Sequence, residues 1–366
     1  MRWLILLALL LALPTVHAER TPLLLWRYDT GQAVSGVAVT ENGTVIAAAY
    51  GNVTLFEAGG RQIGNNNLRD FIAALASTPG GEYTAVGSGE GKVYLLDSNL
   101  TVLWKYLVMV APNAVAISGD GNAIAVAMST PTIYLLNGKG EVAWRYKAEK
   151  VPTSIALSSK GDLIAVATKE AVYLLDREGN GTWLYKTGGP ARGVALDDRG
   201  RVAVGINASL FLLEGGKEVW RYEAGGPVKA VAMTGSGDFI LLSTEDKVYL
   251  LDGGGKLVWD GDIGGILSLA ISPNGSYVAL GTDDHFVYLV RNAEPAVAGS
   301  PAAPGVSWDL NLTERTFGGR RVGEEASGIY VLGRLVPQDT VYRALVAAAV
   351  VILIFLFFPR RRDEVE

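Results

Sequence analysis

One short pattern recurs along most of this chain, and it limits the possible folds more than any other feature. Its clearest copy, KVYLLDGGGKLVW at residues 247–259, contains an apolar run of strand length, an Asp-Gly-Gly-Gly turn and a second apolar run that ends in tryptophan. This order predicts a β-hairpin. Related segments are VYLLDSNLTVLW (93–104), IYLLNGKGEVAW (133–144), VYLLDREGNGTW (172–183) and LFLLEGGKEVW (210–220), with shorter copies at 53–56 and 287–290.

The copies are spaced at a nearly constant interval of about 39 residues, within the range of blade repeats. The second residue of each apolar run marks the interval: Thr54, Tyr94, Tyr134, Tyr173, Phe211, Tyr249 and Tyr288. Upstream of each copy lies another strand–turn–strand segment, in which an alanine precedes a turn glycine at fixed spacing, as in Ala116 and Gly121. Four short strands per period are typical of a β-propeller blade. Seven copies therefore predict seven blades.

The two ends of the repeat region complete each other. Residues 23–28 match the fourth strand of a blade but have no first three strands before them, and the last copy, 266–290, lacks a tryptophan-bearing fourth strand. We expect these ends to pair, because closing the ring protects its sheet edges. The expected fold is all-β: a seven-bladed β-propeller over residues 19–292, closed by the N-terminal strand, plus one C-terminal transmembrane helix.

The Leu-Leu-Asp run, the turn glycine and the tryptophan of each hairpin resemble the repeats of PQQ-like (pyrroloquinoline-quinone-like) and WD-type β-propellers over residues 23–292. The resemblance implies that each indole packs between neighbouring blades. The first copy departs from the pattern, because no tryptophan follows Phe56, and the Gly-His and Trp-Asp marks of WD repeats are missing. The resemblance predicts the fold and carries no particular activity.

Composition limits the chemistry that is available. The formal net charge of −5, with no Lys/Arg run outside the termini, argues against a nucleic-acid partner. The chain has no cysteine, which excludes disulfides, thiol catalysis and cysteine-ligated metal. His285 is the single histidine after residue 18, so multi-histidine metal sites are excluded. Asp283 and Asp284 beside it offer cation ligands, but a solvated acidic loop is the simpler interpretation. We expect no catalytic residue, no cofactor and no metal.

The N-terminus predicts export. Residues 1–18 begin with Arg2, continue through an apolar stretch and end in Val-His-Ala, which is the layout of a secretory signal peptide. An uncleaved N-terminal anchor is the alternative. After the propeller, residues 293–306 are rich in Ala, Pro and Gly and are interpreted as a linker. Residues 307–340 are interpreted as a juxtamembrane stalk or a small β element.

The C-terminus predicts a membrane anchor. Fifteen uninterrupted apolar residues at 344–358 lie within an expected transmembrane helix, 341–359. The three arginines that follow predict a cytoplasmic tail, 360–366, by the positive-inside rule. A cleaved C-terminal sorting signal is the alternative. The expected location is the cell membrane, crossed once, with the propeller outside the cell.

The connections of the blades divide between the two faces of the ring. First-to-second and third-to-fourth strand turns are short and glycine-rich and share one face, here called the turn face. Second-to-third strand connections and inter-blade connections share the other, here called the loop face, where function on propellers usually lies. Four basic residues near the inter-blade loops are candidates to ring the channel mouth and hold an anion or an acidic partner: Arg69, Lys150, Arg192 and Lys229. Scattered solvated charges are the alternative.

Asn-x-Ser/Thr sequons add a second difference between the faces. Candidate glycosylation sites at turns of the turn face are Asn42, Asn99, Asn180 and Asn274, and Asn311 follows the propeller. We expect the turn face to carry sugars and the loop face to remain clear for a partner. The function predicted from these features is a non-enzymatic, membrane-anchored extracellular propeller that binds or scaffolds proteins through its membrane-distal loop face. A PQQ-dependent dehydrogenase and a structural component of the cell envelope are the alternatives.

Overall fold

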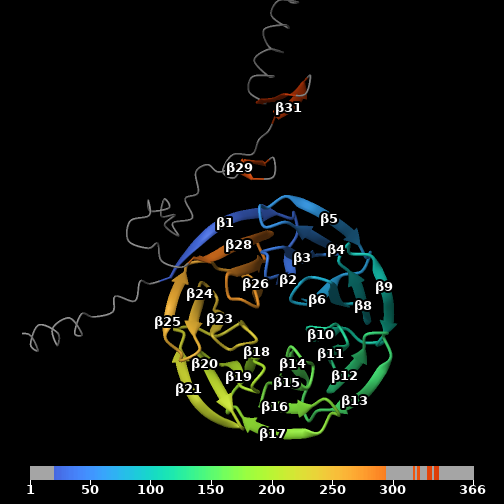
Figure 1. The fold of residues 1–366 in the computed structure, drawn as a ribbon, viewed down its shortest axis with the longest axis vertical. Helices are drawn as coiled ribbons and strands as arrows, with labels where there is room; N and C mark the ends of the chain where they lie inside the picture. Colours follow the sequence, from blue (N-terminus) through green and yellow to red (C-terminus); the bar gives the residue numbers. More distant parts are fainter. Residues whose placement is uncertain (1–19, 294–315, 318–319, 322–327, 332–333, 338–366) are drawn as a thin grey trace, which may run out of the picture. The chain divides into compact units, whose positions relative to one another are not determined.

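Seven four-stranded antiparallel sheets form a ring around a central channel (Figure 1). The computed structural model describes residues 20–293 and four short strands at 316–317, 320–321, 328–331 and 334–337. The chain divides into two units, Met1–Trp308 and Asp309–Glu366. The seven sheets all belong to the first unit, and they confirm the predicted all-β, seven-bladed propeller.

Within blades 1 to 6 the strands follow one another from the channel outward. Their bounds are: blade 1, β2 (Val34–Val39), β3 (Val45–Ala49), β4 (Asn52–Phe56), β5 (Gln62–Asn67); blade 2, β6 (Ile72–Ser77), β7 (Tyr83–Ser88), β8 (Lys92–Asp97), β9 (Val102–Leu107); blade 3, β10 (Pro112–Ile117), β11 (Ala123–Met128), β12 (Thr132–Asn137), β13 (Val142–Lys147); blade 4, β14 (Pro152–Leu157), β15 (Leu163–Thr168), β16 (Ala171–Asp176), β17 (Gly181–Lys186); blade 5, β18 (Ala191–Leu196), β19 (Val202–Ile206), β20 (Ser209–Glu214), β21 (Lys217–Glu223); blade 6, β22 (Ala230–Met233), β23 (Phe239–Ser243), β24 (Val248–Asp252), β25 (Leu257–Gly261).

Blade 7 joins the two ends of the propeller. It contains β26 (Ile266–Ile271), β27 (Tyr277–Thr282) and β28 (Phe286–Ala293), and its outer strand is the N-terminal β1 (Thr21–Asp29). Strand β1 pairs antiparallel with β28, with Trp26 opposite Leu289 and Arg27 opposite Tyr288. The predicted closure by the N-terminal strand is confirmed. Ring closure therefore depends on hydrogen bonds between residues that are far apart in the sequence.

The alanines that repeat in the sequence line the channel. Small side chains fit there because the inner strands converge on the axis. A cavity of about 280 Å³ lies among these strands. The seven repeated alanines all line it: Ala38, Ala76, Ala116, Ala156, Ala195, Ala232 and Ala270.

Outer-strand tryptophans pack on the next blade. Trp104 on β9 donates its indole N–H to the Gly138 carbonyl oxygen at 2.9 Å, in the β12–β13 turn of blade 3. Gly140 in that turn has φ 81°, and a Cβ there would lie 2.8 Å from the indole, so the contact requires glycine. A turn glycine with positive φ also faces the tryptophan of the preceding blade in the pairs Trp26/Gly60, Trp144/Gly179, Trp183/Gly216 and Trp220/Gly255. The implied packing of indoles between blades is confirmed.

The interface between blades 1 and 2 uses the opposite arrangement. Gly64 on β5 has the register position that Trp104 has on β9. The turn that it faces carries Leu100 instead of glycine, in the left-handed conformation (φ 64°) and 1% exposed. Asn66 donates its side-chain N–H to the Leu100 carbonyl oxygen at 2.7 Å. The large apolar side chain thus comes from the turn, and the glycine from the strand.

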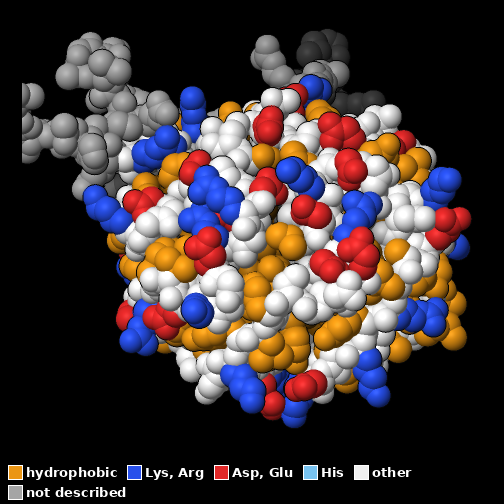
Figure 2. Space-filling view, turned by 60° about the horizontal axis from the view of Figure 1, so that its bottom comes forward, with side chains coloured by type: hydrophobic (Ala, Val, Ile, Leu, Met, Phe, Trp, Pro, Cys, Tyr) orange, Lys and Arg blue, Asp and Glu red, His pale blue; other side chains and the backbone are white. Residues whose placement is uncertain are grey.

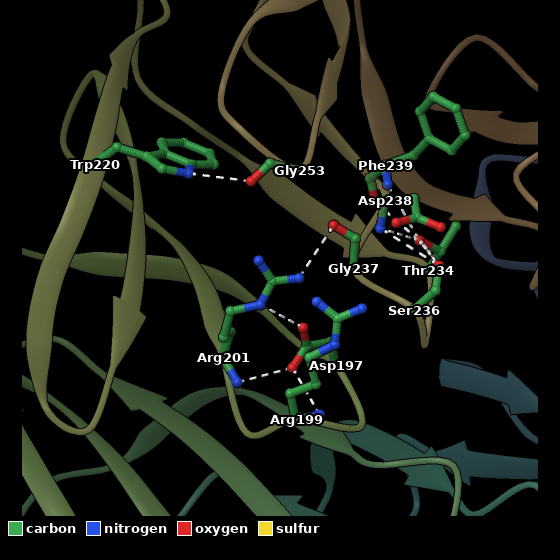
Figure 3. Close-up of polar contacts among 10 residues, drawn as sticks. All are labelled: Asp197, Arg199, Arg201, Trp220, Thr234, Ser236, Gly237, Asp238, Phe239 and Gly253. Atoms are coloured by element: carbon green, nitrogen blue, oxygen red, sulfur yellow. Dashed lines mark hydrogen bonds and ion pairs between the residues drawn. The ribbon is translucent and has the colours of Figure 1, made fainter.

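Turns of the turn face also bind one another across blades (Figure 3). Asp197, fully buried in the β18–β19 turn, accepts hydrogen bonds from the backbone N–H of Arg201 at 2.8 Å and from its guanidinium Nε at 2.7 Å. The same guanidinium donates to the Gly237 carbonyl oxygen of blade 6 at 3.4 Å. Trp220 donates to Gly253 of the same blade at 3.2 Å. Blade 5 therefore holds both turns of blade 6.

The second unit contains two short hairpins. Strand β29 (Thr316–Phe317) pairs with β30 (Arg320–Arg321), and β31 (Gly328–Val331) pairs with β32 (Arg334–Pro337). These strands lie in the segment for which the sequence predicts a stalk or a small β element. The predicted signal peptide (1–18), the linker beyond Ala293, the transmembrane helix (341–359) and the tail (360–366) lie outside the described residues. None of the described residues belongs to a helix that is long and apolar enough to cross a membrane.

The exchange of Trp and Gly at the blade 1–2 interface predicts a strong energetic coupling. Gly64→Trp alone should lower the free energy of unfolding by about 1–3 kcal/mol, because the indole overpacks against Leu100. Leu100→Gly alone should lower it by about 2–4 kcal/mol, since loss of a buried leucine outweighs the relief of left-handed strain. The double variant should recover at least about 1 kcal/mol relative to the sum of the single effects. Urea unfolding of the four proteins measures this coupling, and additive effects would contradict the packing described.

Candidate functional site

Backbone strain is concentrated on the loop face. Among the residues that the structure describes, six non-glycine residues have positive φ. Five of them lie in second-to-third strand loops or inter-blade loops: Tyr50, Arg69, Met109, Asn207 and His285. The left-handed conformation costs about 1–2 kcal/mol for a residue with a Cβ. Glycine would avoid this cost, so these loops hold specific side chains at some expense in stability. Such strain is typical of functional segments.

Four exposed apolar side chains lie in neighbouring loop-face connections over blades 1 to 3, and together they are here called the apolar ridge. Its members are Tyr50 (63% exposed), Phe71 (51%), Met109 (78%) and Val110 (37%). The rings of Tyr50 and Phe71 meet edge to face, with centroids 6.3 Å apart. Phe71 packs against Gly89, and the backbone of Met109 and Val110 packs against Gly91 in the same β7–β8 loop. Large exposed apolar side chains gathered in neighbouring loops are typical of interaction surfaces.

A buried polar network fixes the loop that carries the ridge. Asp70, 5% exposed, lies between Arg69 and Phe71. Its carboxylate accepts hydrogen bonds from the Tyr94 hydroxyl at 2.5 Å and from the Lys92 ammonium at 2.9 Å. Burial alone would raise the pKa of Asp70, but the hydrogen bonds from Tyr94 and Lys92 lower it below its usual value. Burial, followed by the hydrogen bond to Asp70, raises the pKa of Tyr94 to about 12. The network therefore holds an ionised carboxylate and a neutral phenol beneath Phe71.

Two of the four predicted basic residues meet at the channel mouth. Arg192 and Lys229 stand at equivalent positions near the start of the inner strands of blades 5 and 6, and both line a cavity of about 370 Å³. Lys169, which we did not single out in the sequence, lines it as well. Its place in a second-to-third strand connection, which belongs to the loop face, is the signal that could have identified it.

The other two basic residues lie apart from this cavity. Lys150, in the β13–β14 loop, forms an exposed ion pair with Glu170 at 3.1 Å. Arg69, in the β5–β6 loop, donates its backbone N–H to the Asn67 side chain at 2.8 Å. Neither residue lines the 370 Å³ cavity. Each stays a predicted contact for a partner, at the rim of the loop face.

Charges elsewhere on the surface are mixed. Figure 2 shows basic and acidic side chains interspersed over the displayed face, with apolar patches between them. Among the residues that the structure describes, no group of three or more His, Asp or Glu side chains is placed to hold a metal ion. Asp284 accepts a hydrogen bond from Thr282, and the His285 carbonyl oxygen accepts one from Thr30. This acidic loop is thus bonded to its own blade.

The sequon asparagines occupy the predicted turns. Asn42, Asn99 and Asn180 are exposed on the turn face. Asn274 is also exposed, but its side chain donates to the Glu41 carbonyl oxygen at 3.2 Å and accepts a hydrogen bond from the Ser272 hydroxyl. Asn311 lies outside the described residues. Glycosylation at these sites stays a prediction.

The raised pKa of Tyr94 predicts a pH dependence of stability. The ordinary pKa of tyrosine is about 10, so a folded-state pKa of about 12 adds stability that is complete below pH 10. This contribution is lost as the pH rises from about 10 to 12. In urea unfolding, the stability advantage of the wild type over Tyr94→Phe should shrink over that range. Ser88→Ala removes another hydrogen bond to Asp70 without removing a titrating group. The stability that this variant loses relative to the wild type should therefore not change with pH. An advantage over Tyr94→Phe that does not change with pH would contradict the assignment.

The comparisons with known proteins agree with this geometry. A PQQ-type family model, described as outer membrane protein assembly factor BamB, matches residues 16–194 and 168–343. Among solved structures, a chain of the "Crystal Structure of Mitotic Checkpoint Complex" is similar with a TM-score of 0.65 and 15% sequence identity, covering 76% of this chain and 95% of that chain. At this identity the likeness shows a shared fold. No curated protein sequence matches the chain. The two family matches span well over half of the chain, which therefore belongs to the PQQ-type β-propeller family described as outer membrane protein assembly factor BamB.

Proposed function

We propose that this chain is a non-enzymatic module that binds a partner protein through its loop face. The apolar ridge carries the proposal, because aromatic and methionine side chains at this exposure are the usual anchors of protein interfaces. The anchors are preorganised, since the buried Asp70 network fixes the loop of Phe71 and a positive φ fixes Met109. The matched family model is named for an assembly factor, which agrees with a scaffold role.

The expected anchoring agrees with the direction of the chain. Strand β28 ends on the turn face, where the Asn292 side chain donates to the Gly275 carbonyl oxygen at 2.9 Å. A chain that continues past β28 therefore leaves the propeller on the turn face. We propose that residues 341–359 tether the propeller to the cell membrane from outside the cell. The apolar composition of this segment and the arginines after it support the tether.

The residues of the channel do not fit a bound quinone. A PQQ site needs aromatic surface for the planar ring system and carboxylates for its calcium ion. None of the side chains that line the 280 Å³ and 370 Å³ cavities is aromatic, and neither wall contains a carboxylate. We therefore propose a propeller of the PQQ type that has no quinone chemistry.

Titration of the purified chain with PQQ and calcium tests this part of the proposal. We expect the absorbance spectrum of the quinone to stay unchanged, and equilibrium dialysis to show no retention. A saturable spectral change at stoichiometric quinone would contradict the non-enzymatic assignment and would favour the dehydrogenase alternative.

Variants of the ridge test the binding role. The full chain is crosslinked in native membranes and the partners are quantified by mass spectrometry. Phe71→Ser with Met109→Ser should reduce partner recovery at least about tenfold, since each anchor contributes on the order of 1–2 kcal/mol. The melting temperature of this double variant should stay close to that of the wild type, because both side chains are exposed.

A matched control comes from the outer strands. Leu184→Ser with Val219→Ser changes two side chains that are 44% and 52% exposed on β17 and β21, away from the loop face. This variant should recover the same partners as the wild type. Equal losses in both variants would contradict a site on the loop face. If the wild type is crosslinked only to other copies of the same chain in large assemblies, the alternative function as a structural component of the cell envelope is favoured.

A further inference from the structure

One position in each inner strand permits a comparison of all seven blades. It lies three residues before the channel alanine, at the loop-face end, and is occupied by Ser35, Ala73, Asn113, Thr153, Arg192, Lys229 and Leu267. In blades 1, 3 and 4 the side chain donates to a carbonyl oxygen of the next blade: Ser35 to Ile72 at 2.7 Å, Asn113 to Pro152 at 2.9 Å and Thr153 to Ala191 at 2.9 Å. Short polar side chains here join neighbouring blades.

The basic residues at this position have no such role. The Arg192 side chain is exposed and forms no ion pair with any described residue. Lys229 binds Glu245, a residue of the β23–β24 loop that is 67% exposed, with Nζ and Oε2 2.5 Å apart. Neither side chain joins blade 5 or blade 6 to the next blade. Two long cations therefore replace the short bridging side chains without taking over their bonds.

A third cation and a cavity complete the arrangement. Lys169 of blade 4, Arg192 of blade 5 and Lys229 of blade 6 line the same 370 Å³ space, here called the mouth cavity, together with Asn113 and Thr153. No carboxylate belongs to its wall. Like charges that converge on a concave site create a positive potential that attracts anions. The volume lies within the range of ligand pockets.

We propose that the mouth cavity binds carboxylate groups of an acidic segment of the partner protein. Arg192 presents a planar fork that matches a carboxylate, and Lys169 adds a second positive charge. Glu245 already occupies one side of Lys229, so an incoming carboxylate competes with it there. The inference rests on the proposed function: the partner meets the apolar ridge over blades 1 to 3 and the mouth cavity over blades 4 to 6.

Calorimetric titration of the full-length chain with hexaglutamate at low salt tests the inference. The wild type should bind with an affinity that falls as salt is added, because the contacts are ionic. Lys169→Ala with Arg192→Ala should weaken binding at least tenfold, and Arg192→Lys should retain most of it. The matched control is Lys139→Ala with Lys160→Ala, which removes the same charge from exposed turns of the turn face. This control should bind like the wild type.

Two results would overturn the inference. One is the absence of any heat of binding for the wild type. The other is equal weakening in the two double variants, which would indicate non-specific attraction. A parallel titration with glutarate separates two sources of the same chemistry. Binding of the peptide alone supports an acidic protein segment, and equal binding of glutarate supports a site for free dicarboxylates. If hexaglutamate binding fails while partner recovery still depends on Phe71 and Met109, the mouth cavity is excluded and the proposed function stands.

Discussion

The contact between an indole and the turn of the next blade is the interaction on which the ring depends. Trp104 shows its two parts, a hydrogen bond to the Gly138 carbonyl oxygen and a close approach that only glycine at position 140 allows. Trp26 places the same contact at the ring closure, where β1 completes blade 7 and the indole docks on blade 1. Because the chain has no cysteine, burial and hydrogen bonds of this kind supply the cohesion that disulfides give to many exported domains.

Most of this architecture could be predicted from the sequence, because each part of it is repeated. The spacing of Tyr94, Tyr134 and Tyr173 set the blade length, and the unmatched strand around Trp26 indicated how the ring closes. Leu100 is a feature of the fold that the repeat pattern does not predict. The missing tryptophan of blade 1 was visible in the sequence, but its replacement by a leucine from the next turn depends on a contact between blades that no local pattern records.

The candidate site was less predictable, because most of its residues lie in loops whose sequences are not repeated. Arg192 and Lys229 could be assigned to the channel mouth because they lie near inter-blade loops of the loop face. Phe71 and Met109 lie in loops of variable sequence, where apolar residues have no period to distinguish exposed from buried ones. Tyr94 fits the core pattern of its strand, and its bond to Asp70 joins a repeated position to an irregular loop.

The exchange of Gly64 and Leu100 also has a consequence for assembly of the ring. At five other junctions a tryptophan of the outer strand meets a turn glycine, so these contacts share one steric form. At the junction of blades 6 and 7, Trp259 instead donates to the Asn292 side chain at 3.2 Å. Blade 1 placed before any blade with a glycine turn would leave a void, and a tryptophan strand placed before blade 2 would collide with leucine. A single inverted junction thus assigns blade 2 one permitted predecessor. This asymmetry disfavours rings that skip, duplicate or swap a blade while a repetitive chain folds.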